Sequence, residues 1–354
     1  MRIGIVVLGL PPLKIGGSEI QAWELAQQLS RGHEVCVFTK RFSGQSAQEN
    51  INGIPIVRTK FWPFPFNFPS YTALTSYKLR KQAGNLDVLI CYGATPNGVI
   101  GAVVGKLTGL PFCVSIRGSD WYQIEPKWWG HYLLKWVLSK SNAVIVQAEN
   151  IKNSLKSKFG FLDPFVISNG KETDGRTAHG DSVLFVGSLA RHKGVDVLLA
   201  AMKKLPDIPL VIVGDGTERD QLEAQAKGMK VEFAGRLAPH RVKDAMIQRG
   251  RVLVLPSTLN EGFPNVIMEA MSVGLPIIAS DISGGITDLL QGGKNGLLVP
   301  PSDPDELQSA INQLWNDPRQ HSRYSRAGRE ASLQYSWDLI VPKIESVLRS
   351  VTAH

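Results

Sequence analysis

Short apolar runs recur along the whole chain, each bounded by Gly, Pro, Asn or Asp, and they constrain the fold more than any other feature. Such runs are typical of parallel strands in a sheet that is covered on both faces. Stretches with helical spacing separate them, and this alternation predicts a doubly wound α/β architecture. The expected strands are IGIVVLGL, EVCVFTK, DVLICYG, PFCVSIRG, AVIVQA, VLFVGSL, PLVIVGDG, VEFAG, RVLVLPS, PIIASD and NGLLVP.

One polar, Gly-rich break interrupts the series, around ISNGKETDGRTAHGDS. A break of this length without strand or helix signals predicts a linker. The chain has 354 residues, which suits two domains better than one. We therefore expect Rossmann-like domains over residues 1–167 and 168–335. Residues 336–354 are expected to form a C-terminal amphipathic helix, and its return to the N-terminal domain is left open.

Composition places the chain among folded proteins. Hydrophobic residues make up 43% and charged residues 20%, which argues against disorder, and no apolar run approaches the roughly 18 residues of a membrane span. The opening MRIGIVVLGLPPL lacks a small-residue cleavage site and is interpreted as a buried strand rather than a signal peptide. Cys36, Cys91 and Cys113 lie in apolar stretches, so we expect buried thiols and a cytoplasmic location.

The formal net charge is +8, and the Lys and Arg residues are scattered rather than gathered into one block. This pattern gives no support to a nucleic-acid-binding tail. It leaves phosphorylated ligands, an anionic membrane surface and a solvated basic face open.

The strongest functional signal is NEGFPNVIMEAMSVGLPIIASD, in which seven residues separate Glu261 from Glu269. The turn Gly262-Phe263-Pro264-Asn265 follows a strand, and a helix is expected to start about Asn265. Free amides at a helix start favour anions, and a carboxylate can accept hydrogen bonds from two vicinal sugar hydroxyls. The two glutamates therefore predict a site for sugar hydroxyls, although a plain helix-entry role also fits Glu269.

A second signal is VLFVGSLARHKGVDVLLAA, in which Lys193 lies between a strand and a helix. A cation beside a helix N-terminus can share a bound phosphate. A third is the Gly16-Gly17 turn after the first strand, where the absence of Cβ atoms lets the backbone approach a ligand.

A fourth signal is SIRGSDWY, in which a strand delivers Arg117 and Asp120 to its carboxyl edge. Ligands of α/β sheets bind at this edge. Capping of the following helix is the alternative role of Asp120.

With these motifs, the chain resembles the retaining glycosyltransferases of family four over nearly its whole length. The resemblance implies the GT-B type of α/β fold, in which two Rossmann-like domains face each other across a cleft. It implies that Glu261 contacts the transferred sugar and that Glu269 holds the ribose diol of the nucleotide. The amides around Phe263, Pro264 and Asn265 would contact the sugar or the diphosphate.

The resemblance assigns the remaining residues one by one. Lys193 matches the lysine that neutralises the donor diphosphate, while Ser188 stands where the family commonly has arginine, and compensation by Arg191 is left open. Arg117 stands where the family often has histidine and would bind the sugar or a phosphate. The implied catalytic residues are Lys193, Glu261 and Arg117. The implied donor-binding residues are Gly16, Gly17, Ser188, Arg191, Lys193, Gly216, Glu261, Gly262, Phe263, Pro264, Asn265 and Glu269, with Glu19 and Asp120 on the acceptor side.

The implied reaction moves a sugar from a nucleotide-diphosphate sugar to a glycan or lipid-linked acceptor with retention of configuration. A donor phosphate oxygen would take the acceptor proton, so no side-chain nucleophile, metal or other cofactor is expected. No G-x-G-x-x-G after a strand, Walker A or zinc motif is present, and helix capping explains Asp303-Pro304-Asp305. A sugar-nucleotide epimerase of the same fold and an inactive sugar-nucleotide-binding protein stay open.

The sequence gives little indication of the acceptor. The segments KFWPFPFNFPSYTALTSYKLRK and WYQIEPKWWGHYLLKW, around Trp62 and Trp128, combine aromatic with basic residues. They suit a sugar-stacking surface or a peripheral contact with the inner face of the membrane, and ordinary packing is the alternative. The implied context is synthesis of a cell-surface polysaccharide or glycolipid, without nucleic acid as a partner.

Overall fold

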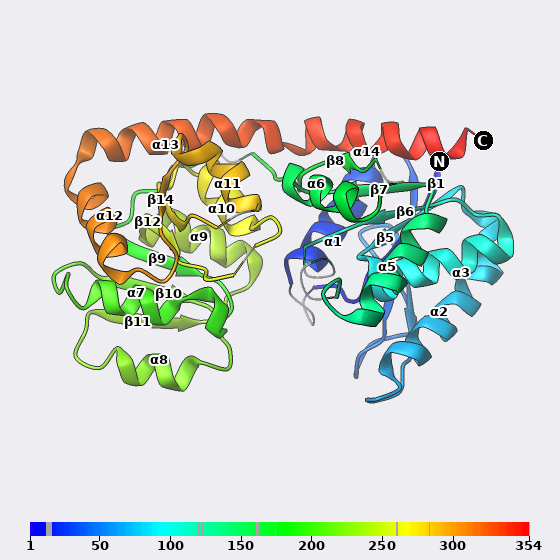
Figure 1. Ribbon diagram of the computed structural model, residues 1–354. Coiled ribbons are helices and arrows are strands. Elements are labelled where there is room, and N and C mark those ends of the chain that lie inside the picture. The colour runs from blue at the N-terminus through cyan, green and yellow to red at the C-terminus, as the bar shows by residue number, and fades with distance from the viewer. Residues whose placement is uncertain are drawn as a thin grey trace. The chain divides into compact units, whose positions relative to one another are not determined.

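The computed structural model describes residues 1–11, 16–118, 121, 124–160, 163–173, 175–259, 261–282 and 284–353. The chain forms two compact units, residues 1–170 with 337–354 and residues 171–336. The sequence placed these divisions at 167/168 and 335/336. The C-terminal helix α14 (Trp337–Thr352) belongs to the N-terminal unit. Each unit is an α/β domain, so the predicted fold class is confirmed (Figure 1).

The N-terminal unit is built on an eight-stranded sheet with the strand order β3-β4-β2-β1-β5-β6-β7-β8. Its pairs are parallel except β3–β4, and Ile5 of the central strand lies opposite Val37 and Ile90. The strands are β1 (Arg2–Val6), β2 (Glu34–Lys40), β3 (Gln48–Ile51), β4 (Ile54–Thr59), β5 (Val88–Tyr92), β6 (Phe112–Ser115), β7 (Ala143–Val146) and β8 (Phe165–Val166).

Helices cover both faces of this sheet, which is why its central strands are buried apolar runs. Two separate cores result. One contains Leu25 of α1 and Ile340 of α14; the other contains Tyr71, Val104 and Leu134 from α2, α3 and α5. The helices are α1 (Gly17–Leu29), α2 (Asn67–Gln82), α3 (Val99–Thr108), α5 (Trp128–Lys140) and α6 (Glu149–Lys158).

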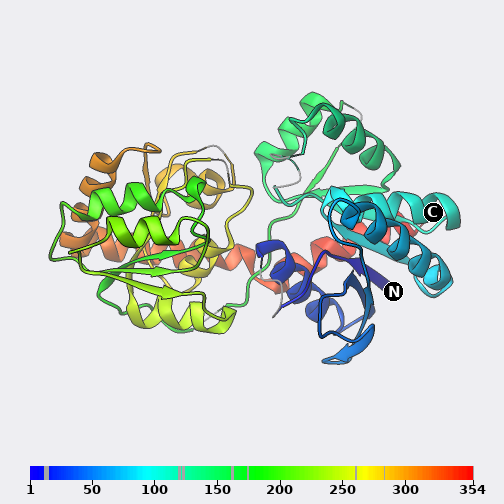
Figure 2. The same ribbon diagram turned by 90° about the horizontal axis from the view of Figure 1, so that it is seen from below.

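The C-terminal unit has a six-stranded, wholly parallel sheet with the order β11-β10-β9-β12-β13-β14. Helices α7 and α8 lie on one face and α9 on the other (Figure 2). The strands are β9 (Ser182–Val186), β10 (Leu210–Val213), β11 (Val231–Gly235), β12 (Gly250–Leu255), β13 (Ile277–Ser280) and β14 (Leu297–Val299). The helices are α7 (Val195–Met202), α8 (Arg219–Gln225), α9 (Pro239–Arg249), α10 (Asn265–Ser272), α11 (Gly285–Leu290), α12 (Pro304–Asn316) and α13 (Pro318–Ser332).

The order of strands in the second sheet reverses between β9 and β12. From β9 the chain proceeds outward through β10 and β11, and it then returns to β12 and continues through β13 and β14 on the other side. Neighbouring parallel strands whose connections lead apart in this way leave a crevice at their carboxyl ends. The loops that follow β9 and β12 are therefore the places to look for a ligand site.

Several local predictions are confirmed. Cys91 and Cys113 are buried free thiols and Cys36 is partly buried, and burial raises the pKa of Cys36 to about 11. Asp303 caps α12 by accepting from the amides of Asp305 and Glu306. No helix in the described ranges combines the length and apolar character needed to cross a bilayer.

Candidate functional site

Lys193 and Glu261 lie on either side of the strand-order reversal and form an ion pair. Lys193 ends a short 3₁₀ turn after β9, and Glu261 lies in the loop after β12. The lysine Nζ donates to Glu261 Oε1, and Ser257 Oγ donates to the same oxygen at 2.7 Å. Both charged side chains are largely shielded, with 17% and 15% exposed. The structure thus joins two residues that the sequence assigned to different parts of a donor.

The backbone beneath this pair explains its position. Gly194 has φ +66°, and a Cβ there would overlap the carbonyl oxygen of Pro256, so only glycine allows the turn after β9 to pack against the segment after β12. The amide of Thr258 donates to the carbonyl of His192 at 2.8 Å. This tie fixes the loop that carries Lys193 against the loop that carries Glu261.

The Gly-Phe-Pro bend is held by packing on one side and leads into a helix on the other. Phe263 is buried, and its ring meets Tyr335 edge-on with 5.7 Å between centroids. The Gly285 amide donates to the carbonyl of Glu261 at 3.2 Å. Pro264 occupies the cap position and α10 begins at Asn265, as predicted, without a side-chain cap. Pro264 itself gives the helix no side-chain cap, and the amides at a helix start suit an anionic group.

Glu269 lies one turn into α10 and has its own cationic partner. Lys171 Nζ is 3.2 Å from Glu269 Oε1, and the two side chains are 14% and 20% exposed. Lys171 is also tied to the main chain before α14, because its amide donates to the carbonyl of Tyr335 at 2.7 Å. Each of the two candidate glutamates is thus paired with one lysine.

The loops after β9 and β10 lie against each other. A Cβ at Gly216 would overlap the carbonyl oxygen of Leu189, and the Leu189 amide donates to the carbonyl of Asp215 at 3.0 Å. Ser188 and Arg191 are both exposed in the loop after β9. These contacts place Gly216, Ser188 and Arg191 at the same sheet edge as Lys193.

Three sequence-predicted residues belong to the N-terminal unit, at the start of α1. Gly16 is the cap residue and Gly17 the first residue of α1. A Cβ at Gly16 would overlap the carboxylate of Glu19, which is only 6% exposed. Ser18 Oγ donates to Glu19 Oε2 at 3.0 Å. Because a buried carboxylate at a helix N-terminus complements the helix dipole, Glu19 stabilises the start of α1, and its role toward the acceptor stays a prediction.

Arg117 follows β6 in the N-terminal unit, and several of its contacts are internal. Its guanidinium donates to Asn169 Oδ1 and, at 3.2 Å, to Ser115 Oγ. It also lies over the Tyr92 ring at 4.7 Å from the centroid. These contacts anchor the segment that leaves the N-terminal unit. Asp120 lies outside the described residues.

The sequence did not predict two residues that contact the candidate glutamates. Ser257 follows β12 and is fully buried beside Glu261. Its position just after the end of a strand is the sequence signal that could have identified it. Lys171 fell within the expected linker, where nothing local predicts a partner almost one hundred residues away.

The structure therefore defines a protein of two α/β domains whose second sheet carries paired lysine and glutamate side chains at its strand-order reversal. Two family models match consecutive parts of the chain, Glycosyltransferase Family 4 over residues 15–174 and Glycosyl transferases group 1 over residues 175–331. The chain belongs to the family-four glycosyltransferases, which have the GT-B fold.

Individual relatives support this assignment. An uncharacterized glycosyltransferase of Methanocaldococcus jannaschii is 27% identical, with 99% of this chain and 98% of the relative covered. Sucrose-phosphate synthase of Thermosynechococcus elongatus has a similar fold, with a TM-score of 0.84, 22% identity and 99% of each chain covered. HepE of Anabaena, whose structure contains UDP and glucose, gives a TM-score of 0.81 at 21% identity over 99% of this chain and 100% of that one.

Proposed function

We propose that this glycosyltransferase moves a sugar, with retention of configuration, from a nucleotide-diphosphate sugar to a glycan or lipid-linked acceptor. The observation that supports the proposal most is the Lys193–Glu261 pair at the strand-order reversal of the second sheet. It offers a cation for a diphosphate and a carboxylate for sugar hydroxyls within one ion pair. The UDP and glucose bound to HepE show that a protein of this fold accepts such ligands.

The proposed chemistry follows from the charge that develops during transfer. When the bond between the anomeric carbon and the diphosphate breaks, negative charge grows on the leaving group, and a preorganised cation there lowers the barrier. Lys193 is held in place by Glu261 and exchanges this partner for the diphosphate. Glu261, still held by Ser257, then accepts from hydroxyls of the transferred sugar.

The rest of the donor site is proposed around this centre. Glu269 takes the ribose diol, and the amides that start α10 face the diphosphate or sugar. A donor phosphate oxygen takes the proton of the acceptor hydroxyl, so the same face of the sugar is attacked. Neither a nucleophilic side chain nor a metal takes part in this scheme.

The acceptor side is proposed for the N-terminal unit, with Glu19 and Asp120, while Gly16 and Gly17 keep the donor-binding role and Arg117 the catalytic role that the family resemblance implies. The proposed setting is cell-surface polysaccharide or glycolipid synthesis in the cytoplasm, at the inner face of the membrane. The exposed aromatic residues of the N-terminal unit support a setting beside lipid or glycan.

The test is a screen of the protein against nucleotide sugars that differ in base and sugar, with and without candidate acceptors. We expect one donor to be consumed faster when its acceptor is present, and NMR of the product to show the donor's anomeric configuration. An inverted product would contradict retention. Conversion of the donor to a second sugar nucleotide without any acceptor would show an epimerase instead.

A further inference from the structure

A long stretch of the N-terminal unit is almost free of acidic residues. Residues 50–119 contain seven Lys or Arg residues and a single acidic residue, Asp87. Most of the chain's formal net charge of +8 therefore comes from this stretch. Helices α2 and α3 lie within it, and α5, which follows, also contains neither Asp nor Glu.

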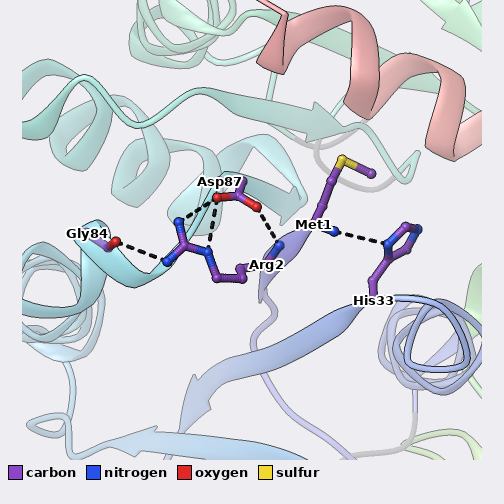
Figure 3. A network of polar contacts seen from close by, with 5 residues as sticks. All are labelled: Met1, Arg2, His33, Gly84 and Asp87. Carbon is purple, nitrogen blue, oxygen red and sulfur yellow. Dashed lines mark hydrogen bonds and ion pairs between the residues drawn. The ribbon is translucent and has the colours of Figure 1, made fainter.

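The one acidic residue is already neutralised. Figure 3 shows Asp87 accepting from Arg2, which donates from its backbone amide at 2.7 Å and from two guanidinium nitrogens at 3.1 and 2.7 Å. The Arg2 guanidinium holds the pKa of Asp87 below its ordinary value. Asp87 therefore does little to offset the basic residues of α2 and α3.

The three acid-free helices form one continuous surface. Helix α3 packs against both α2 and α5. A groove of about 560 Å³ separates α2 from α3 and is lined by Phe68, Tyr77, Arg80 and Leu107. A second groove lies between α3 and α5, with Lys106 and Trp136 in its lining. Residues of α3 line both grooves, Leu107 the first and Lys106 the second, so the grooves flank this helix; we call this surface the α2–α3–α5 face.

Large apolar side chains stand out from this face and from the segment that leads into it. Tyr77 and Leu107 are each 57% exposed, and Phe64 and Trp62, just before α2, are 87% and 64% exposed. Trp128 and Tyr132 of α5 are also exposed. Soluble proteins rarely leave so many aromatic side chains together in water, so the face is expected to have a partner.

We propose that the α2–α3–α5 face is a membrane-binding surface that rests on an anionic lipid bilayer. Its aromatic residues enter the interfacial region, and Arg80, Lys106 and neighbouring lysines lie at the level of the headgroups. Aromatic side chains with an apolar body and a polar edge favour that region, and each basic residue near an anionic surface strengthens binding. The proposal rests on the membrane setting of the proposed function, but it does not depend on which sugar the enzyme transfers.

The chemistry of the face favours lipid over nucleic acid. The α2–α3 groove is lined mainly by apolar side chains, and Arg80 is the one charged residue among its described lining residues. A nucleic-acid surface instead needs a dense row of cations along the phosphate backbone. Lys81 Nζ lies over the Tyr77 ring, 4.5 Å from its centroid, so this end of α2 combines a basic with an aromatic side chain.

The experiment is sedimentation of the full-length protein with vesicles of phosphatidylcholine, with or without phosphatidylglycerol, and without donor or acceptor. We expect binding to the anionic vesicles at low salt and much weaker binding at about 1 M salt, where the Debye length is about 3 Å. Arg80→Glu/Lys106→Glu should weaken binding at least about tenfold, since each basic residue near the surface contributes about fivefold. Trp62→Ser/Phe64→Ser should weaken binding with no change in charge.

The matched control is Lys227→Glu/Lys230→Glu, which makes the same change in charge at exposed positions of the C-terminal unit. It should bind vesicles like the wild type. Equal loss in both charge-reversal variants would overturn the proposal, because net charge rather than this face would then govern binding. Absence of binding to anionic vesicles at low salt, or tighter binding to a DNA or RNA oligonucleotide than to vesicles, would overturn it too.

Discussion

Lys171, the first residue of the C-terminal unit, holds the carboxylate of Glu269 with 3.2 Å between Nζ and Oε1. The glutamate lies on α10, and the lysine is fixed by its backbone bond to Tyr335. Because both side chains are mostly shielded, the pair orients the carboxylate more firmly than a surface ion pair would. The lysine contacts one carboxylate oxygen, Oε1, and in the proposed scheme Glu269 also accepts from the ribose hydroxyls.

Glu269→Gln is predicted to weaken binding of the product nucleoside diphosphate by about tenfold or more, since charge-assisted hydrogen bonds contribute roughly 1.5–3 kcal/mol. Lys171→Met should weaken it less, by about two- to fivefold, because only orientation is lost. Titration calorimetry on both variants and on the double variant measures their coupling. Strictly additive losses would show that Lys171 does not act through Glu269, and unchanged affinity in Glu269→Gln would reduce that residue to a helix-entry acid.

Lys193→Ala is predicted to lower kcat by about a hundredfold, the scale of losing one preorganised electrostatic contact to a developing charge. His192→Ala is the matched control, because the neighbouring side chain is exposed and only its carbonyl is used, by Thr258. Steady-state kinetics with the donor found in the screen measures both. Near-wild-type turnover by folded Lys193→Ala would reduce Lys193 to a structural partner of Glu261.

Glu261→Gln should separate turnover from nucleotide affinity. The product nucleotide carries no transferred sugar, so its affinity for the variant should stay the same or rise. In the variant, no ion pair between Lys193 and a carboxylate has to break before Lys193 binds the diphosphate. Turnover of the intact donor should fall, since the sugar loses a charge-assisted hydrogen bond. Calorimetry beside kinetics checks both halves. A large loss of nucleotide affinity would reverse the roles assigned to Glu261 and Glu269.

The sequence predicted the sheets well because their strands are buried on both faces and leave continuous apolar runs. It missed the β3–β4 hairpin, and for β3 the reason is the opposite one. Gln48, Glu49 and Asn50 are all exposed, so no apolar pattern marks β3. The turn signal was nevertheless present, because Asn52 and Gly53 both have positive φ, 53° and 83°, as a two-residue hairpin loop requires.

The candidate site was predictable as single residues but not as pairs. Gly262-Phe263-Pro264 and the Lys193 turn stand out locally, whereas their proximity depends on β9 and β12 being neighbours in the sheet. The contact between Lys193 and Glu261 spans 68 positions and that between Lys171 and Glu269 spans 98. Long-range pairing of this kind follows from strand order, which no local pattern encodes.

Metal independence is a prediction that the proposed scheme makes directly. Lys193 and the amides of α10 supply the positive field at the leaving diphosphate, so activity should survive an excess of EDTA. Within the ranges that the structure describes, no three His, Cys, Asp or Glu side chains gather as metal ligands. Turnover is measured with EDTA and after adding back Mg²⁺ or Mn²⁺. Complete loss that a divalent ion restores would require a metal in the scheme.

Two glycines lie where the chain passes from the N-terminal to the C-terminal unit, and they supply a stability prediction and its control. A Cβ at Gly170 would overlap the ring of Trp337, whereas one at Gly175 would meet nothing within 4 Å. Both backbone groups of Gly170 are also bonded to Gln21, at 3.0 and 3.1 Å, so the glycine cannot shift away without breaking those bonds. Gly170→Ala should therefore destabilise the N-terminal unit by about 1–3 kcal/mol, the usual cost of overpacking.

Gly175→Ala should change stability by no more than about 0.5–1 kcal/mol, and in the stabilising direction, because it only restricts the unfolded chain. Chemical denaturation followed by circular dichroism compares the two variants with the wild type. Equal midpoints for all three proteins would mean that the Trp337 ring moves freely aside. That result would show that the start of α14 is not packed tightly against the exit from the N-terminal unit.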